Sequence, residues 1–554
     1  MSLTKQIHVY AIGTDAFYNE AEQQVHERLL TLYALRKKIT TWIEKLEDGK
    51  SVGNQLETYT LDDLNTWKKE TNNQIKQEKE NLTELLDASL GSTESRVLNE
   101  QVLSEKNVIS LFESSLTRAL EIKTNELSED IFVVSVYFFQ VFESIVKHGF
   151  YYKGEKYIFF TASAGQIRQK KAVFLKESSF KRIEQKIMCG LTIEEINAKG
   201  GIVKNKFLAY LALGSSATEP WTDFDIDKAI VVDDFETNVF GEVDFIDETT
   251  YEIKREKRFT PIPHSDGEGF MMDGPTRMFR APWIKGLLTH FNFHQFIKEN
   301  CPEGDCTVYD IYGEPHRIIE EDIRYILTKS QLKLSSYYES WNCYKARFKT
   351  CGCEASYCNI EEDELPKSRI NYQMLQTLSD MTDDEIDVLI ESSAEEIDKI
   401  GNDYQTTMRL LGATETNKNP SYFQQALMVY PELFRDQYCR DILKQTKASL
   451  VKQAKAGRLR VNGKYTFVSC DPYAFFEWLC LGEQNPKGLL SEGEVYCSLY
   501  NNGDELACLR SPHLYREWTI KKNKRNELLD KWLGDTKCIY TSCFDLISRI
   551  LQFD

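Results

Sequence analysis

Hydrophobic positions recur every three or four residues at the start of the chain. They keep this spacing from Ala21 to Glu47 and again, in a more polar stretch, from about Leu61 to Leu86. A third helix is expected from Ser95 to about Lys123. Such spacing places apolar side chains on one face of a helix. The pattern predicts a helical hairpin or small bundle over residues 1–125, built for packing rather than catalysis.

Residues beyond about 130 follow a different pattern. Ile131 to Phe139 and Tyr157 to Phe160 are rich in β-branched and aromatic residues, which favour strands or a buried helix. An amphipathic helix is expected at Lys181 to Met188, and a strand at Ala229 to Val232. We therefore expect a mixed α/β region over residues 126–255.

Helical patterns return between residues 361 and 465. Thr382 precedes an acidic run, Asp383-Asp-Glu385, which predicts an N-cap followed by a favourable first turn. Lys444 to Arg460 predicts a basic helix. We interpret residues 361–465 as a helical connector between two folded regions.

Length and composition indicate a soluble multidomain protein. A chain of 554 residues exceeds what one hydrophobic core needs, so roughly three or four domains are expected. The most apolar segment, Ile131 to Val146, is too short and too polar to span a bilayer. Met1-Ser-Leu-Thr4 opens no secretory leader. We expect a cytoplasmic protein without a membrane partner.

The fourteen cysteines are expected to be reduced thiols, because no export signal precedes them. One cluster allows a second interpretation. Cys343, Cys351, Cys353 and Cys358 are close enough in sequence to hold a structural zinc ion. Their spacing lacks the paired C-x2-C knuckles typical of zinc sites, which favours free thiols.

The net charge of −18 argues against a protein coated in basic surface. Basic tracts still occur, for example at Arg168 to Lys171, Lys199 to Lys206 and Lys521 to Arg525, and acid is concentrated elsewhere, as in Asp380 to Asp398. A groove can be basic while the outside of a protein is acidic. The charge balance is therefore compatible with a nucleic-acid partner.

Two lysines in apolar surroundings, Lys285 and Lys333, are candidates for phosphate contacts. Lys285 follows a glycine-rich turn, His264 to Phe270. Lys333 lies near the end of the segment Leu327 to Leu334. An ammonium group aimed into a groove from a strand or turn contacts phosphate as a point charge. The alternative is that the glycines only make turns and the lysines only solvate a surface.

A rival motif lies between residues 214 and 227. Gly214-Ser215 followed by Asp225-Ile-Asp227 resembles the signature of polymerase-β-type nucleotidyltransferases, in which carboxylates on a strand bind Mg²⁺. Alternation along a strand would put Asp223, Asp225 and Asp227 on one face. The sequence Glu219-Pro-Trp221 leaves little room for the helix that should follow the turn. A strand entrance rich in solvated aspartates is the simpler interpretation.

Several motifs, taken in chain order, resemble those of a known family. They are Thr161-Ala-Ser-Ala-Gly-Gln-Ile-Arg168, Met188-Cys-Gly190, Lys199 to Lys206, His264-Ser-Asp-Gly-Glu-Gly269, Arg280-Ala-Pro-Trp-Ile-Lys-Gly286, Thr328-Lys-Ser-Gln-Leu-Lys333 and Leu509-Arg-Ser-Pro-His-Leu514. In this order they resemble elements of the two-barrel RNA polymerases, which include the eukaryotic RNA-dependent RNA polymerases of RNA silencing and their phage and bacterial relatives. The resemblance covers roughly Phe160 to Asp554.

The resemblance implies an α+β multidomain fold with an N-terminal helical region, a first double-psi β-barrel over residues 256–360, helical insertions, and an incomplete second barrel over residues 466–554. It implies template-directed RNA synthesis from nucleoside triphosphates on a nucleic-acid template, with Mg²⁺ as cofactor. Lys285 and Lys333 would be catalytic. The implied nucleic-acid or nucleotide contacts are Arg168, Lys204, Asp266, Gly267, Arg280, Gln331 and Arg510.

Asp554 stands where the family has the first aspartate of its metal-binding D-x-D-G-D loop. The other two aspartates of that loop are not in the sequence, so Asp554 would be a catalytic residue in an incomplete metal site. We therefore expect the N-terminal portion of a longer polymerase, inactive as it stands, with an RNA or a DNA template. The alternatives are the polymerase-β-type enzyme and a non-catalytic nucleic-acid-binding protein on a polymerase scaffold.

Overall fold

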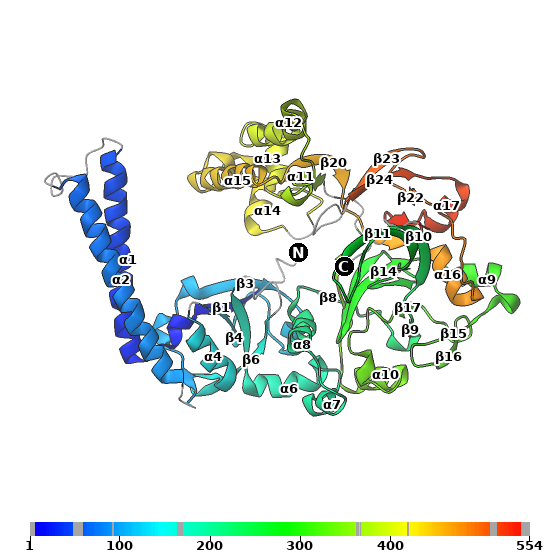
Figure 1. The fold of residues 1–554 in the computed structure, drawn as a ribbon, viewed down its shortest axis with the longest axis horizontal. Helices are drawn as coiled ribbons and strands as arrows, with labels where there is room; N and C mark the ends of the chain where they lie inside the picture. Colours follow the sequence, from blue (N-terminus) through cyan, green and yellow to red (C-terminus); the bar gives the residue numbers. More distant parts are fainter. Residues whose placement is uncertain are drawn as a thin grey trace. The chain divides into compact units, whose positions relative to one another are not determined.

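A computed structural model shows the chain as two compact units (Figure 1). It describes residues 6–47, 59–90, 94–136, 138–162, 170–361, 365, 367–417, 420–509 and 518–544. One unit comprises residues 6–185 and 202–215, and the other comprises residues 186–201 and the chain from Ser216 onwards. The five regions delimited from the sequence, and their grouping into domains, remain a prediction.

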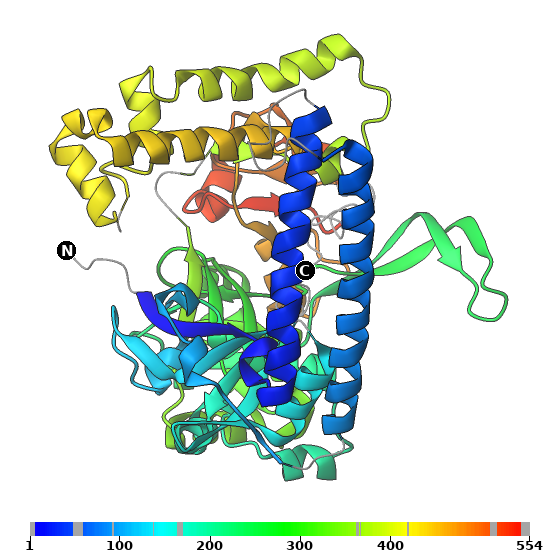
Figure 2. The same ribbon diagram turned by 90° about the vertical axis from the view of Figure 1, so that its left-hand side faces the viewer.

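The first unit contains two long antiparallel helices, α1 (Glu20–Glu47) and α2 (Leu61–Leu90) (Figure 2). The indole rings of Trp42 and Trp67 lie 6.0 Å apart between them. Further along the hairpin, Arg28 forms a 3.1 Å ion pair with Glu78. The first two predicted helices are therefore confirmed.

A seven-stranded mixed sheet forms the core of the first unit. Its strand order is β2 (Arg96–Val97), β5 (Phe150–Tyr152), β6 (Glu155–Thr161), β7 (Lys171–Lys176), β4 (Leu127–Ser135), β1 (Gln6–Gly13) and β3 (Val108–Phe112). Phe132, Phe150, Tyr157 and Phe174 fill the core beneath it. The strand alternative for Ile131 to Ser135 and for Tyr157 to Phe160 is confirmed.

The helix predicted from Ser95 to Lys123 is wrong. This stretch forms β2, two 3-10 turns, β3 and only a short helix, α3 (Ser115–Ala119). The run Val108-Ile-Ser-Leu-Phe112 pairs antiparallel with β1, and Ile109 lies opposite Val9. Pairing with a strand distant in sequence outweighed the local helical spacing.

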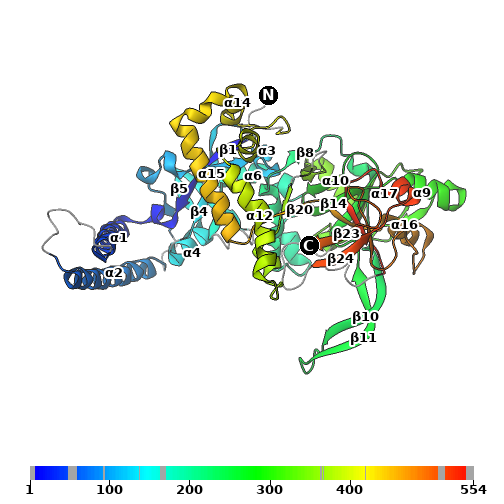
Figure 3. The same ribbon diagram turned by 90° about the horizontal axis from the view of Figure 1, so that it is seen from above.

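A second seven-stranded sheet organises the other unit. Its order is β8 (Glu219–Pro220), β18 (Ser356–Ile360), β13 (Arg277–Ala281), β14 (Ile284–His290), β12 (Glu268–Met271), β17 (Tyr325–Thr328) and β9 (Ala229–Val232). The strand predicted at Ala229 to Val232 is therefore confirmed. Two further strands, β10 (Glu236–Ile246) and β11 (Ile253–Pro263), pair as a long antiparallel ribbon that projects from this unit (Figure 3).

A five-stranded sheet follows in the same unit. Its order is β21 (Val468–Cys470), β25 (Ile539–Thr541), β22 (Glu494–Tyr496), β24 (Trp518–Asn523) and β23 (Glu505–Leu509). The helices α9 (Phe293–Asn300), α16 (Pro472–Leu481) and α17 (Glu527–Leu533) share one aromatic core, in which Phe293 stacks on Phe476 at 5.1 Å. The α+β multidomain class is confirmed, and closure of the sheets into double-psi barrels remains a prediction.

A block of helices lies between two short paired strands, β19 (Lys367–Arg369) and β20 (Arg460–Lys464). Its helices are α11 (Tyr372–Leu375), α12 (Asp383–Lys399), α13 (Tyr404–Leu410), α14 (Tyr422–Val429) and α15 (Gln437–Lys455). The buried carboxylate of Glu396 forms ion pairs with Arg369, Arg409 and Arg460. These contacts fix α12 to both strands.

The remaining elements are α4 (Phe139–His148), α6 (Glu177–Ile187), α7 (Ile193–Ala198), α8 (Lys204–Leu211), α10 (Trp341–Thr350), β15 (Thr307–Tyr309) and β16 (Pro315–Arg317). The amphipathic helix predicted from Lys181 matches α6. Within the described ranges, no helix has the length and apolar content needed to cross a membrane.

Thr382 caps α12 as predicted, and its loss should loosen that helix. The Thr382 hydroxyl accepts the Glu385 N–H at 3.4 Å, and the Glu385 carboxylate accepts the Thr382 N–H at 2.9 Å. Thr382→Ala should cost about 1 kcal/mol and speed hydrogen exchange in the first turn of α12. The control Thr446→Ala, inside α15, should neither lower stability nor speed hydrogen exchange, because alanine favours helix interiors. Unchanged exchange in Thr382→Ala would contradict the capping role.

Candidate active site

Gln331 joins three of the sequence motifs. Its side chain is fully buried, its Oε1 accepts the Thr328 N–H at 3.0 Å, and its Nε2 donates to the Leu287 carbonyl at 2.9 Å. Two glycines make room for it. A Cβ atom at Gly286 would lie 2.2 Å from Nε2 of Gln331, and one at Gly269 would lie 2.7 Å from its Oε1. The motifs at residues 264–269, 280–286 and 328–333 therefore fold together around one amide.

Lys285 and Lys333 lie on neighbouring backbone segments joined by a single antiparallel bridge. The Lys285 N–H donates to the Gln331 carbonyl at 3.1 Å, and the Lys333 N–H donates to the Trp283 carbonyl at 2.8 Å. Both lysines are half-buried. They are diagonal neighbours across the bridge, and the ammonium group of Lys333 donates to the Ser330 carbonyl.

The turn at Asp266-Gly267 is tied to the same loop. Gly267 has a φ of +75°, its N–H donates to the Ser330 Oγ at 2.7 Å, and that hydroxyl donates to Oδ1 of Asp234 at 2.6 Å. Burial raises the pKa of the Asp234 carboxyl, and the nearby charge of Asp266 adds to the rise. Asp234 was not predicted from the sequence, where its only signal is its position just after β9.

Glu268 connects the seven-stranded and five-stranded sheets of the second unit. The residue is 5% exposed. Oε1 accepts the Thr289 hydroxyl at 2.6 Å, and Oε2 accepts the Cys470 N–H from β21 at 3.1 Å. Burial raises the pKa of Glu268 to about 7, even though these hydrogen bonds oppose the rise. The sequence showed this residue only as one letter of a glycine turn.

The segment Met188-Cys-Gly190 contacts Trp283, which lies two residues before Lys285. Its Met188 carbonyl accepts the indole N–H of Trp283 at 2.8 Å, and its Gly190 carbonyl accepts a guanidinium N–H of Arg347 at 2.7 Å. Tyr338 donates its hydroxyl to the carbonyl of Cys189 at 3.2 Å. The backbone carbonyls of this motif therefore hold side chains that flank the site.

The other predicted contacts are placed less centrally. Arg280 is half-buried in β13 and donates to the Phe279 carbonyl at 2.9 Å. Lys204 is exposed at the start of α8 and belongs to the first unit, whereas Lys285 and Lys333 belong to the second. Arg168, Arg510 and Asp554 lie outside the described residues. The structure therefore brings together Asp266, Gly267, Lys285, Gln331 and Lys333 among the predicted residues.

Asp223, Asp225 and Asp227 are exposed just before β9, as expected of a strand entrance rich in solvated aspartates. Asp225 is the N-cap of a short 3-10 helix, and its carboxylate accepts the Asp227 N–H at 2.9 Å. Asp227 forms a 2.8 Å ion pair with Lys349. Aspartate side chains compete well for nearby backbone N–H groups, and here capping displaced strand formation. The carboxylate alignment of the polymerase-β-type motif is not formed.

The whole chain was also compared with known proteins. No family model matches the chain. The whole chain is 44% identical, over 556 residues, to the protein named DNA-directed RNA polymerase YonO of Bacillus phage SPbeta. This supports an RNA polymerase-type relationship. The chain spans 63% of the length of that relative.

The four cysteines considered for zinc do not gather. All of them lie in described parts of the chain, yet no three of Cys343, Cys351, Cys353 and Cys358 bring their sulfur atoms within 4.8 Å of one another. Cys353 instead contacts the Lys186 carbonyl at 3.2 Å, and Cys358 the Met278 carbonyl at 3.8 Å. In the described structure the four sulfur atoms are therefore not arranged around one point.

Proposed function

We propose that this chain forms part of a DNA-templated RNA polymerase, in which Lys285 and Lys333 contact phosphates of the incoming nucleotide and of the nascent RNA. The observation that supports the proposal is the junction of three motifs around Gln331, in which Lys285 and Lys333 belong to adjoining backbone segments. Its second support is the similarity, over the whole of this chain and 63% of the relative, to a protein named as a DNA-directed RNA polymerase.

The chemistry of nucleotidyl transfer favours this arrangement. Negative charge builds up on the phosphates in the transition state, and preorganised cations stabilise it. Lysine is a strongly hydrated point charge, so its position must be fixed by the backbone. The bridge between the two segments and the buried amide of Gln331 provide that rigidity.

Mg²⁺ belongs to the proposal as the expected cofactor, supplying two-metal activation of the 3′-hydroxyl and stabilisation of the leaving group. Asp554, which the resemblance assigns to it, lies outside the described residues. Two carboxylates lie near the lysines. Asp234 accepts a hydrogen bond from Ser330, and Glu268 accepts hydrogen bonds from Thr289 and from the Cys470 N–H. They do not fit a two-metal site.

Substitution of the two lysines tests the proposal in the product of the complete gene. Lys285→Ala and Lys333→Ala should each lower RNA synthesis on a DNA template by about tenfold to a hundredfold, because a cation near the developing charge is lost. Nucleotide incorporation under saturating template measures this effect.

Lys329→Ala is the matched control, because Lys329 lies in the same loop but is exposed and paired with Asp233. It should retain near-normal synthesis. Equal losses in all three variants would show that the loop tolerates no change and would remove the argument for phosphate contact. An active Lys285→Ala enzyme, or synthesis that requires an RNA template, would overturn the proposal.

A further inference from the structure

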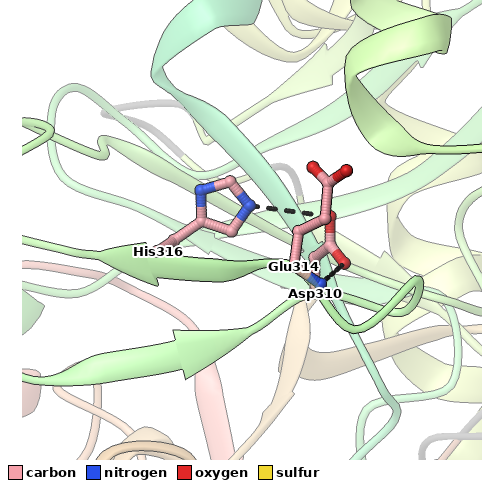
Figure 4. Close-up of side chains that lie close together, drawn as sticks. All are labelled: Asp310, Glu314 and His316. Carbon is pink, nitrogen blue, oxygen red and sulfur yellow. Dashed lines mark hydrogen bonds and ion pairs between the residues drawn. The ribbon is translucent and has the colours of Figure 1, made fainter.

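A second cluster of charged side chains lies in the hairpin formed by β15 and β16 (Figure 4). Asp310 follows β15, Glu314 precedes β16, and His316 lies within β16. Ligand atoms from all three lie within 4.8 Å of one another. Figure 4 shows the His316 imidazole turned toward the Asp310 carboxylate, with Glu314 beside it.

Two atoms of this cluster are buried without a hydrogen bond. Asp310 is 5% exposed and His316 is 7% exposed. Oδ2 of Asp310 and Nε2 of His316 neither donate nor accept a hydrogen bond, and they face each other at 3.5 Å. Buried polar atoms without partners are costly and rare in folded proteins. Two such atoms that face each other indicate that a cation bridges them.

The tautomer of His316 defines what that must be. Its Nδ1 lies 2.9 Å from Oε2 of Glu321. An ionised carboxylate only accepts hydrogen bonds, so Nδ1 carries the hydrogen, and Nε2 of the neutral ring presents a lone pair. A lone pair facing a carboxylate oxygen is repulsive unless a cation joins them. Either a proton or a metal ion can play that part.

We propose that Asp310, Glu314 and His316 bind a divalent metal ion of the zinc type, and that this ion fixes the hairpin. Two ligand atoms on one tetrahedral zinc ion are about 3.3 Å apart, close to the 3.5 Å between Asp310 and His316. One imidazole with two carboxylates suits Zn²⁺ better than Mg²⁺, which prefers oxygen ligands and water.

Each proposed ligand is already oriented by a second contact. Oδ1 of Asp310 accepts the backbone N–H groups of Tyr312 and Glu314, both at 2.9 Å, so Oδ2 is directed inward. Oε2 of Glu314 accepts the Asn342 amide at 2.8 Å. Together with the contact from Glu321 to His316, these bonds form the outer shell that metal ligands usually have.

Charge also favours a divalent cation. Three carboxylates, from Asp310, Glu314 and Glu321, contact or surround one imidazole. Burial alone would raise the pKa of Glu321. The hydrogen bonds from His316 and from the Arg317 N–H, with the nearby charge of Lys345, lower it overall. A divalent ion would balance the charge of the two carboxylates that face it, Asp310 and Glu314, whereas a single added proton would balance only one of them.

The site would connect the hairpin to the lysine loop. Ile311 donates its N–H to the Val231 carbonyl in β9 at 2.9 Å, and Tyr312 donates its hydroxyl to the Ser335 carbonyl at 2.8 Å. Ser335 lies two residues beyond Lys333. A metal ion at the hairpin would therefore stiffen the loop that carries Lys333.

Metal analysis of the purified full chain tests this proposal independently of any polymerase activity. Protein prepared with zinc and dialysed against metal-free buffer should retain about one zinc ion per chain. Asp310→Asn and His316→Gln should lose it, and the remote control His148→Gln should not. Asp310→Asn is the sharper variant, because its new amide can donate to Nε2 of His316 and keep the hairpin folded.

Cobalt substitution gives a readout that does not depend on a variant folding. The wild-type chain with Co²⁺ should show visible absorption of a four- or five-coordinate ion without the sulfur-to-cobalt band of a cysteine site. Chelation should lower the melting temperature of the wild type but not of Asp310→Asn. Absence of bound metal in the wild type, or equal zinc in all variants, would overturn the proposal.

Discussion

Gly286→Ala should severely destabilise the second unit. The added Cβ would lie 2.2 Å from Nε2 of Gln331 and 2.3 Å from the Gly267 carbonyl oxygen. The second contact is with backbone, which cannot swing away as a flexible side chain can. Ordinary overpacking costs about 1–3 kcal/mol, and we expect a larger loss here because two of the joined motifs must separate. Thermal and urea unfolding of the full chain measure it.

A second glycine supplies the control. A Cβ at Gly214 would meet nothing within 4 Å, so Gly214→Ala should unfold like the wild type. The double variant Gly286→Ala/Gln331→Ala should recover little, because the Gly267 carbonyl still blocks the new methyl group. If Gly286→Ala were as stable as Gly214→Ala, the close packing of the three motifs around Gln331 would be incorrect.

Glu268→Gln should stabilise the protein above neutral pH. Burial raises the pKa of Glu268 from 4.5 in the unfolded reference to about 7 in the folded chain. Below about pH 4.5 both states are protonated, so the group has no net effect there. Between about pH 4.5 and 7 the unfolded state ionises first, and stability is lost as pH rises. Above about pH 7 the loss is complete, at about 3 kcal/mol.

Glutamine imitates the protonated acid at this position. Its carbonyl can accept the Cys470 N–H, and its amide can donate to the Thr289 hydroxyl. The melting temperature of Glu268→Gln should therefore match that of the wild type at about pH 4 and exceed it at about pH 8. The exposed control Glu339→Gln should give no such pH-dependent difference. A constant difference between Glu268→Gln and the wild type across this range would refute the titration.

The sequence predicted elements whose residues act locally. The helices α1 and α2 follow from their apolar spacing, and the cap at Thr382 follows from a hydroxyl three residues before a glutamate. The helix expected from Ser95 failed because its strand partner, β1, lies about a hundred residues away and cannot be seen in the local pattern. The capping contact of Asp225 was also missed, because the sequence indicated only a strand entrance rich in aspartates before Ala229.

The candidate site was predicted in part for the same reason. Its glycines and lysines stand out as a motif, so Gly267, Lys285 and Lys333 were identified from the sequence. Asp234 and Glu268 were not, because their significance comes from burial and from partners such as Ser330 and Cys470, which are far away in the chain. Burial of a carboxyl is a property of the tertiary structure and leaves no mark on its neighbours in sequence.

The pairing of β19 with β20 has a consequence for how this gene can change. The helical block between them leaves and re-enters the chain at adjacent points, since Arg369 lies opposite Arg460. It also has its own small core, including Met408, Leu427 and Cys439. A segment whose ends adjoin can be acquired, exchanged or deleted without displacing the flanking structure. Evolution can therefore vary the length and charge of this block independently of the sheets that hold the lysines.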